Sequence, residues 1–397
     1  MAMDKTRPGK EIGVMVYKSH TSGIGGRLKH KAEDFLVEEI TPDGLILKAG
    51  ISLGLDLGQP AEQIHLTLEK SNISTLRAVK ELSNALRVSQ KRIGYAGTKD
   101  KRAVSTQRIS VWGVGADDVM RVNLGGIRIR DPQYCDDRIN LGDLQANRFT
   151  VRIRDVGLSS GEIESRVKAI DGELVSGYPN FFGVQRFGSK RPITHLVGRE
   201  IVKGNLREAV LIYLTSCFPG EGESLADVRK RLRDTGDMRR AVREYPRHLE
   251  YEHSLINHLI REEGDWGGAL MQLPYGLRKM FVHAYQSYIF NLALSYYIRE
   301  GFIVERLPLV GYKSGVDEVT SMILEDEGVG PGDFRVSSLP GLGSAGVLRD
   351  AFVYYRDFVL LGVGVDDYYP SKSMVELRFI LPKGCYATVL LEEFMKS

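Results

Sequence analysis

The sequence predicts an α/β (α+β) protein in which a mixed, largely antiparallel sheet domain is interrupted by a helix-rich α/β insertion domain. Strand-like patterns occur near both ends of the chain, helical patterns fill the middle, and 397 residues exceed what one ordinary core accommodates. We therefore place the sheet domain at residues 1–179 and 351–397 and the insertion at residues 180–350.

The first part of the chain carries several strand patterns and an amphipathic helix. Ile64–Leu68 alternates with the period of two that indicates a half-buried strand, and strict alternation makes 149–154 the clearest strand. From Ser74 or Thr75, apolar residues at helical spacing predict a helix whose core stripe is Leu76, Val79, Leu82 and Leu86. We also expect strands at 35–37 and 106–111 and a helix at 162–174.

The second part of the chain is dominated by one long helical pattern, Leu277–Arg299, which Gly301 terminates. Its expected core face is Met280, Phe281, Ala284, Tyr288 and Leu292. The acidic, glycine-rich stretch 315–346 is predicted to be loop-rich. A strand at 375–381 alternates until Pro382 stops it, which favours an antiparallel or mixed sheet with one covered face, and a terminal helix is expected at 387–394.

The composition excludes several classes of protein. Hydrophobic residues make up 43% and charged residues 26%, which is typical of a globular protein, and no apolar run approaches the roughly 18 residues of a membrane span. The polar N-terminus lacks the apolar core of a signal peptide, so we expect a cytoplasmic, monomeric protein. Three scattered cysteines and eight dispersed histidines predict neither a disulfide framework nor a metal site.

Charge is unevenly distributed along this nearly neutral chain. Seven Lys/Arg and one acidic residue lie between Arg87 and Arg108, and five Lys/Arg and one Glu lie between Gln185 and Lys203. Two concentrated basic segments fit a surface that meets nucleic-acid phosphates, although solvated loops would have the same composition. Charge alone leaves both interpretations open.

The sharpest local feature is a basic loop with two glycines, Gly94–Arg102, that contains a single carboxylate, Asp100. Nearby cations favour the ionised form of a carboxyl group, which makes it a competent nucleophile or base. The glycines would allow a tight loop and a close approach of substrate. The alternative is a surface turn in which Asp100 offsets the charge of its neighbours.

Three longer motifs accompany this loop in order along the chain: Gly97–Gln107, Asn180–Gly188 and Ala284–Asn291. Together with weaker matches between residues 29 and 391, they resemble the TruD family of tRNA pseudouridine synthases over essentially the whole chain, and the chain length is more similar to the archaeal branch. Two positions depart from the family pattern. Ala146 stands where Gly is usual, and Glu392 stands where Arg is common, which leaves a contact by that Arg in doubt.

The resemblance implies an isomerase that breaks the C1′–N1 bond of a uridine, turns the uracil and rejoins it through C5, typically at position 13 of tRNA. No cofactor is needed, because the product is an isomer of the substrate. By analogy Asp100 is the catalytic initiator and Lys29 its charged partner, unless Lys29 is an exposed strand-edge lysine. Phe149 would stack on the flipped base or would be an ordinary core residue, and Asn147 would hydrogen-bond the loop that carries Asp100.

Further side chains of the motifs are candidates for RNA contact, since aromatic and cationic groups together suit single-stranded nucleotides. Core packing explains the phenylalanines equally well, and a solvated polar helix face explains the last two residues nearly as well. The candidates are Lys99, Lys101, Arg102, Gln107, Phe182, Gln185, Arg186, Phe187, Gln286 and Asn291.

One motif predicts a function that we reject. Gly341–Gly346 matches GxGxxG literally, but it follows Leu339-Pro340 instead of a buried strand, so no nucleotide cofactor is expected. Two rival functions remain: a non-catalytic RNA chaperone on the same fold, and a glycosidase-like hydrolase, which needs a second carboxylate at roughly 5–10 Å. An intact motif around Asp100 argues against the first.

Overall fold

The computed structural model describes residues 9–218 and 221–396, and the chain divides into two compact units. Unit 1 combines the segment up to Lys18 with Pro179–Val353, and unit 2 combines Ser19–Tyr178 with Tyr354–Ser397. The division lies close to the expected boundaries, with one difference. The N-terminal segment groups with the helix-rich unit, because its backbone is hydrogen-bonded there: the Met15 N–H donates to Ser295 Oγ at 3.1 Å.

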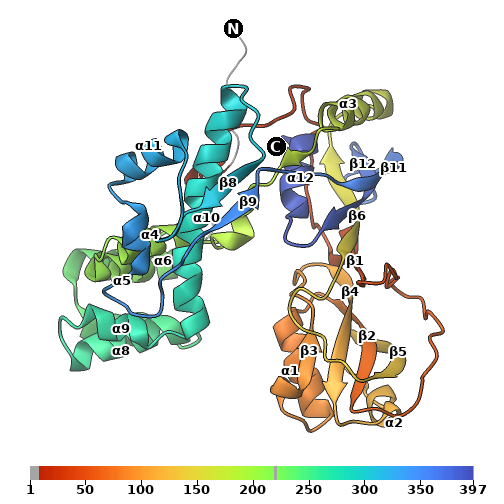
Figure 1. The fold of residues 1–397 in the computed structure, drawn as a ribbon, viewed down its shortest axis with the longest axis horizontal. Helices are drawn as coiled ribbons and strands as arrows, with labels where there is room; N and C mark the ends of the chain where they lie inside the picture. The colour runs from red at the N-terminus through yellow and green to blue at the C-terminus, as the bar shows by residue number, and fades with distance from the viewer. Residues whose placement is uncertain (1–8, 219–220, 397) are drawn as a thin grey trace. The chain divides into compact units, whose positions relative to one another are not determined.

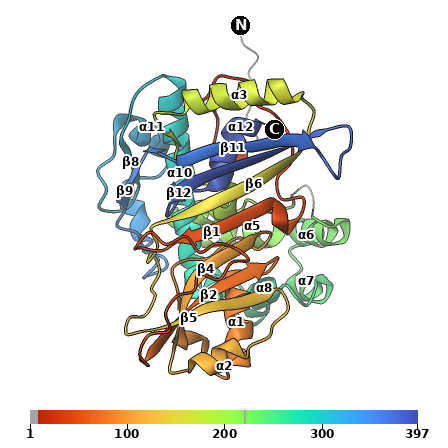
Figure 2. The same ribbon diagram turned by 90° about the vertical axis from the view of Figure 1, so that its right-hand side faces the viewer.

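Unit 2 is built on one mixed sheet in which all pairs of strands are antiparallel except β1 and β4 (Figures 1 and 2). The predicted mixed, largely antiparallel sheet is therefore confirmed. The strand order is β11 (Arg356–Val365), β12 (Ser373–Pro382), β6 (Ala146–Val156), β1 (Phe35–Ile40), β4 (Val104–Trp112), β2 (Gln63–Ser71) and β5 (Ile127–Cys135), with β3 (Ile93–Tyr95) beside β4.

Alternation in the sequence accounts for the centre of this sheet. The alternating apolar residues of β12, from Val375 to Leu381, are buried, and the strand ends at Pro382 as predicted. Antiparallel pairing of β6 with both β1 and β12 places Phe149 opposite Val37 on one side and Phe379 on the other. The register of β6 thus determines which side chains lie beside the predicted catalytic residues.

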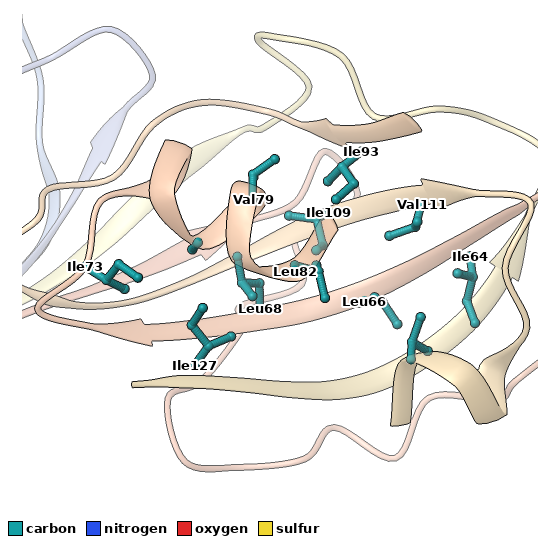
Figure 3. Packing of buried hydrophobic residues seen from close by; sticks show 12 residues of the cluster. Ile64, Leu66, Leu68, Ile73, Val79, Leu82, Ile93, Ile109, Val111 and Ile127 are labelled. Carbon is teal, nitrogen blue, oxygen red and sulfur yellow. The ribbon is translucent and has the colours of Figure 1, made fainter. Parts of the chain in front are cut away.

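Helix α1 (Thr75–Ala85) covers one face of β2 and β4, where Val79 and Leu82 pack against Leu68 and Ile109 (Figure 3). Ser74 caps its N-terminus by accepting a hydrogen bond from the Arg77 N–H. Leu76, expected in the core stripe, is 61% exposed because the buried face is formed by Ala78, Val79 and Leu82. The other helices of unit 2 are η2 (Ala32–Asp34), η3 (Gln90–Arg92), α2 (Ala116–Met120), α3 (Ser160–Glu173) and α12 (Ala387–Met395).

Unit 1 is organised around the long helix α10 (Tyr275–Arg299), which confirms the predicted long helix. Most of its residues between Phe281 and Ser295 are buried, but the predicted core face was partly wrong: Met280 is 37% exposed, and Tyr288 and Leu292 are only partly buried. Helix α11 (Glu318–Glu327) lies within the stretch that we expected to be loop-rich. The remaining elements are η1 (Lys10–Ile12), β7 (Tyr178–Pro179, at the boundary), η4 (Val184–Arg186), α4 (Thr194–Val202), α5 (Leu206–Thr215), α6 (Glu223–Thr235), α7 (Met238–Glu244), α8 (Glu250–Arg261), α9 (Trp266–Met271), β8 (Arg306–Leu309), η5 (Pro331–Arg335), β9 (Val347–Asp350) and β10 (Phe352–Val353).

Helix α4 packs very closely against α10 at Gly198. A Cβ atom at this position would lie 2.0 Å from the Phe281 carbonyl oxygen, so only glycine allows this approach. In the described part of the chain, no helix is both long enough and apolar enough to cross a membrane.

Candidate active site

The loop between β3 and β4 carries Asp100, and its carboxylate forms an ion pair with Lys29. Lys29 Nζ lies 2.5 Å from Asp100 Oδ2, although the two residues are 71 positions apart in sequence. Lys29 lies shortly before β1 and Asp100 shortly before β4. Because β1 and β4 are parallel, with Leu36 opposite Val104, the segments that precede them meet at the same edge of the sheet.

Exposure differs across this ion pair. The Asp100 side chain is 37% exposed, whereas that of Lys29 is 18% exposed and lies with Nζ 4.1 Å from the centre of the Phe35 ring. A cation at this distance from an aromatic face is stabilised by the ring. The Asp100 carboxylate is therefore accessible to solvent, whereas the Lys29 ammonium is less exposed and contacts the Phe35 ring.

Lys29 has a left-handed backbone conformation, with φ of +55°, that a non-glycine residue adopts only under constraint. Two contacts constrain the adjoining segment: Arg102 Nη2 donates to the His30 carbonyl at 2.6 Å, and the Arg27 N–H donates to the Arg154 carbonyl at 2.7 Å. We infer that the Lys29 ammonium is positioned by the constrained backbone of its segment and not by its own flexible side chain.

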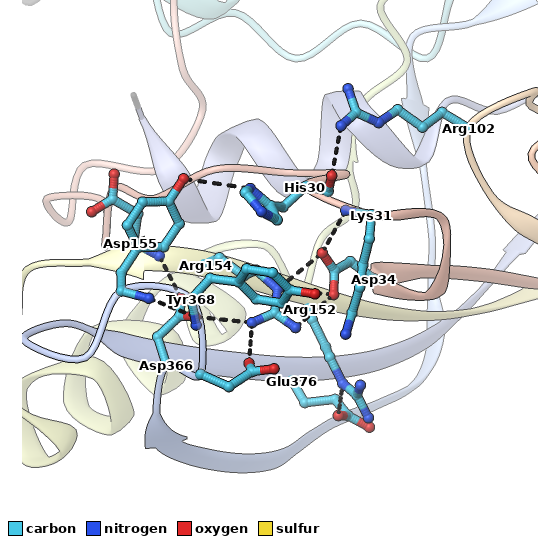
Figure 4. A network of polar contacts seen from close by, with 12 residues as sticks. His30, Lys31, Asp34, Arg102, Arg152, Arg154, Asp155, Asp366, Tyr368 and Glu376 are labelled. Atoms are coloured by element: carbon cyan, nitrogen blue, oxygen red, sulfur yellow. Dashed lines mark hydrogen bonds and ion pairs between the residues drawn. The ribbon is translucent and has the colours of Figure 1, made fainter.

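A buried ionic network anchors this segment to β6 (Figure 4). The Arg154 guanidinium, 1% exposed, lies 2.9 Å from both Asp34 and Asp366 and also contacts Asp367. Asp34 in turn accepts the Lys31 N–H at 3.0 Å, two residues after Lys29. The network thus links the backbone beside Lys29 to β6.

Lys99 is directed away from solvent, contrary to its expected role as an RNA contact. Its side chain is 5% exposed, and Nζ lies 2.7 Å from Glu39 Oε2 while donating to Asn147 Oδ1 at 2.6 Å. Burial leaves no ammonium surface for a phosphate, so Lys99 supports the loop. The Asn147 side chain does contact the loop that carries Asp100, as predicted from the strand pattern.

Phe149 lies in a row of aromatic rings that runs along the sheet. Its ring stacks on Phe379 with centroids 5.5 Å apart and meets Phe35 edge-on at 6.0 Å. The Phe35 ring also contacts the Lys29 ammonium, so Phe35 connects Phe149 to the Lys29–Asp100 pair. Phe149 is 8% exposed, which leaves only a small part of it available to a base.

Side chains of α1 and of the sheet face that it covers form hydrogen bonds with the backbone of the loop that carries Asp100. Gln107 Nε2 donates to the Gly97 carbonyl at 3.2 Å, and Thr75 Oγ1 accepts the Lys99 N–H at 2.9 Å. Gln107 is fully buried, so the structure assigns it to support of the loop and not to the expected RNA contact. Gly94 lies in β3, where a Cβ atom would be 2.3 Å from the Ile139 carbonyl oxygen, so packing explains this glycine.

The two other motifs lie in unit 1, and much of them is buried. Four of the expected RNA contacts have little or no surface: Phe182 at 7%, Phe187 at 0%, Gln286 at 4% and Asn291 at 0% exposed. Asn291 Nδ2 donates to the carbonyls of Ile12 and Phe182, and Gln286 donates to Val310 O and Ser344 Oγ. Burial gives all four side chains a structural role, which the hydrogen bonds of Asn291 and Gln286 reinforce, and we do not include them in an RNA surface.

The remaining expected RNA contacts are at least partly accessible. Lys101 and Arg102 are exposed beside Asp100, Gln185 is exposed in unit 1, and Arg186 is half-buried, with Nε donating to Ser287 Oγ at 3.2 Å. Their contact with RNA stays a prediction.

Sequence reasoning missed two charged residues that touch the loop, Glu39 and Lys70. Both are fully buried charges inside strands: Glu39 pairs with Lys99, and Lys70 Nζ donates to the Asp100 carbonyl at 2.7 Å. The signal was present, because an ionisable residue within a strand pattern must find a partner when it is buried. Lys70 continues the series Ile64, Leu66 and Leu68, where alternation calls for another apolar residue.

A single accessible carboxylate held against a lysine, on a loop above a mixed sheet, defines the arrangement of an acid–base or nucleophilic enzyme. Comparison with known proteins identifies the family. The family model described as tRNA pseudouridine synthase D (TruD) matches residues 11–307 and 296–394. A probable tRNA pseudouridine synthase D from Methanosarcina mazei is 34% identical, covering 98% of this chain and 97% of the relative, and one from Archaeoglobus fulgidus is 36% identical, covering 98% and 99%.

A solved structure supports the same assignment. The crystal structure of the putative tRNA pseudouridine synthase D from Methanosarcina mazei has a TM-score of 0.80 at 34% identity, covering 98% of this chain and 97% of that one. The chain belongs to the TruD family of tRNA pseudouridine synthases, which are isomerases.

Proposed function

We propose that this protein isomerises a uridine of tRNA to pseudouridine and that Asp100 initiates the reaction. The observation that carries the proposal is the Lys29–Asp100 ion pair within a family of pseudouridine synthases. The ammonium favours the ionised carboxylate, and the exposed side of Asp100 is available to the substrate. Attack at C1′, attack at C6 and removal of the 2′ proton are all open to such a carboxylate.

The supporting residues have separate roles in this proposal. Lys29 pairs with the charge of Asp100, Asn147 fixes Lys99 and with it the loop, and Phe149 stacks on the extruded uracil. Stacking on an aromatic ring offsets roughly 1–3 kcal/mol of the cost of unstacking the base. Lys101, Arg102, Gln185 and Arg186 bind phosphates or bases of the same tRNA.

Asp100→Asn is the decisive variant, because it removes the charge and keeps the shape. We expect no pseudouridine from the variant, with tRNA affinity within a few-fold of wild type. Asp136→Asn, a change of the same kind after β5 in unit 2, serves as the control and should retain activity. Loss of binding in Asp100→Asn, together with no product from wild type, would contradict the enzymatic function and favour an RNA chaperone.

A hydrolase would be distinguished by its product. An isomerase retains the base, so the reaction should release no free uracil, and uracil in the supernatant would contradict the proposal. Mapping pseudouridine in tRNA from cells with and without the protein tests the expected position 13. We further propose a cytoplasmic monomer, which cell fractionation and light scattering would check.

A further inference from the structure

Lys70 is a fully buried lysine that approaches the catalytic loop from inside the sheet. It lies near the end of β2, at register positions opposite Ser105 of β4 and Ile127 of β5, neither of which carries a charge. Its ammonium donates to the backbone carbonyl of Asp100 at 2.7 Å. Burying an ammonium is costly, so its retention at this position calls for an explanation.

The loop is held at three successive points by side chains from this buried face. Gln107 binds the Gly97 carbonyl, Thr75 accepts the Lys99 N–H, and Lys70 binds the Asp100 carbonyl. Thr75 also donates to Gln107 Oε1 at 3.1 Å, which ties two of the supports together. Of the three supports, only Lys70 carries a charge and only Lys70 touches Asp100 itself.

We propose that Lys70 is a positioning residue for Asp100: its buried ammonium fixes the Asp100 backbone carbonyl, while Lys29 pairs with the Asp100 carboxylate. The inference rests on the proposed function of Asp100. A hydrogen bond from an ammonium to the carbonyl is charge-assisted, and it fixes the backbone from which the carboxylate projects. Lys70 does not touch the substrate.

The ionisation of Lys70 provides a readout of this role. Burial lowers the pKa of Lys70 to about 8, an effect partly opposed by the negative charge of Asp100 and reinforced by the positive charge of Lys99. The ammonium is therefore present at pH 7 and is lost as the pH rises through about 8. A neutral amine donates a weaker hydrogen bond than an ammonium, so the backbone of Asp100 is held less firmly and activity should fall on the alkaline side.

The test compares Lys70→Met, Lys70→Arg and wild type in single-turnover and steady-state assays on the same tRNA between pH 6.5 and 9. We expect Lys70→Met to lower kcat by about tenfold or more, which is one decade per 1.36 kcal/mol, with KM within a few-fold. Its pH profile should lack the alkaline limb. Lys70→Arg should keep its charge and extend activity to higher pH. Lys80→Met, on the exposed face of α1, is the matched control and should behave as wild type.

Several outcomes would overturn the inference. A merely structural lysine predicts that Lys70→Met lowers the melting temperature while kcat and the pH profile of the folded fraction stay unchanged. If Lys70→Met does not fold, Lys70→Arg decides, and an alkaline limb at the wild-type position contradicts the role. Titration of the uridine itself is common to all variants. If wild type makes no pseudouridine at any pH, the proposed function fails, which is distinct from failure of the Lys70 role alone.

Discussion

Lys29 supplies positive charge to Asp100 from a backbone conformation that costs a non-glycine residue about 1–2 kcal/mol. Strain of this size persists only where the surroundings impose it, and here Arg102 and the Arg154 network hold the adjacent residues. The Lys29 ammonium contacts the Asp100 carboxylate and the ring of Phe35. The proposed role of Asp100 is therefore tested most directly by changing Lys29.

Lys29→Met is expected to lower kcat roughly 10- to 100-fold, since each decade corresponds to 1.36 kcal/mol of lost stabilisation of the carboxylate. Binding of tRNA should change by only a few-fold. Arg27→Met is the matched control, because Arg27 forms a similar ion pair at 3.0 Å with Asp155 and not with Asp100. Equal activity of both variants in a pseudouridine assay would contradict the role of Lys29.

Strand β6 contains residues of the candidate site and also Arg154, which belongs to the buried ionic network of unit 2. Asn147 and Phe149 lie near its start beside the catalytic loop, and Arg154 lies near its end within the buried ionic network. The same strand also bridges β1 and β12. A change at Arg154 should therefore reduce stability first and activity only through the segment that contains Lys29.

Arg154→Met should lower the free energy of unfolding by about 3–5 kcal/mol, because it leaves the buried carboxylates of Asp34 and Asp366 without their cation. Arg152→Met, two residues earlier on β6, removes a more exposed pair with Glu376 and should cost about 0–1 kcal/mol. Urea unfolding of both variants measures the difference. Equal costs would show that the Arg154 network is no more stabilising than a surface pair.

The same network predicts how stability depends on pH. Burial alone would raise the pKa of Asp366, but hydrogen bonds from the N–H groups of Asp155 and Tyr368 and from Arg154 outweigh it and lower the pKa below 3.8. A lowered pKa in the folded state contributes stability above the unfolded value that is lost as the pH falls through the folded one. Acid titration of unfolding should show this loss below about pH 4. Asp366→Asn should weaken that dependence, and an unchanged titration would contradict the assignment.

On the scale of the whole molecule, two units with separate cores share one chain. Asp100, Lys29, Asn147 and Phe149 all belong to unit 2, whereas the motifs at 180–188 and 284–291 belong to unit 1. Much of these two motifs is buried and hydrogen-bonded to backbone, so they maintain the fold of unit 1. The proposed catalytic residues therefore all lie in one unit.

Binding of tRNA should weaken steeply with added salt, because contacts between cations and phosphates release counterions. Lys101→Gln should lower affinity and reduce the slope of log Kd against log salt by about one. Lys80→Gln, an exposed lysine on α1, is the control and should leave the slope unchanged. A slope for Lys101→Gln equal to that of wild type would remove Lys101 from the phosphate-binding surface.

Local patterns were enough to predict those elements whose residues alternate or repeat along the chain itself. The strand at Val375–Leu381 and the long helix ending at Arg299 are examples. Strand β11 was missed, because it is a nearly continuous apolar run with two glycines and two register shifts against β12 instead of a clean alternation. Helix α11 was missed because its acidic, glycine-flanked sequence is typical of a loop.

The sequence by itself determined the class of fold, the candidate catalytic carboxylate and the expected contact of Asn147 with the loop. The family resemblance implied Lys29 as the charged partner of Asp100, but no local pattern did, and the tertiary structure shows the pair. Lys99, Lys101 and Arg102 are its neighbours in sequence, yet Lys99 is turned inward to Glu39, and it is Lys29 that meets the carboxylate. The physical reason is the parallel register of β1 and β4, which brings two distant segments to one edge of the sheet, and no local pattern specifies that register.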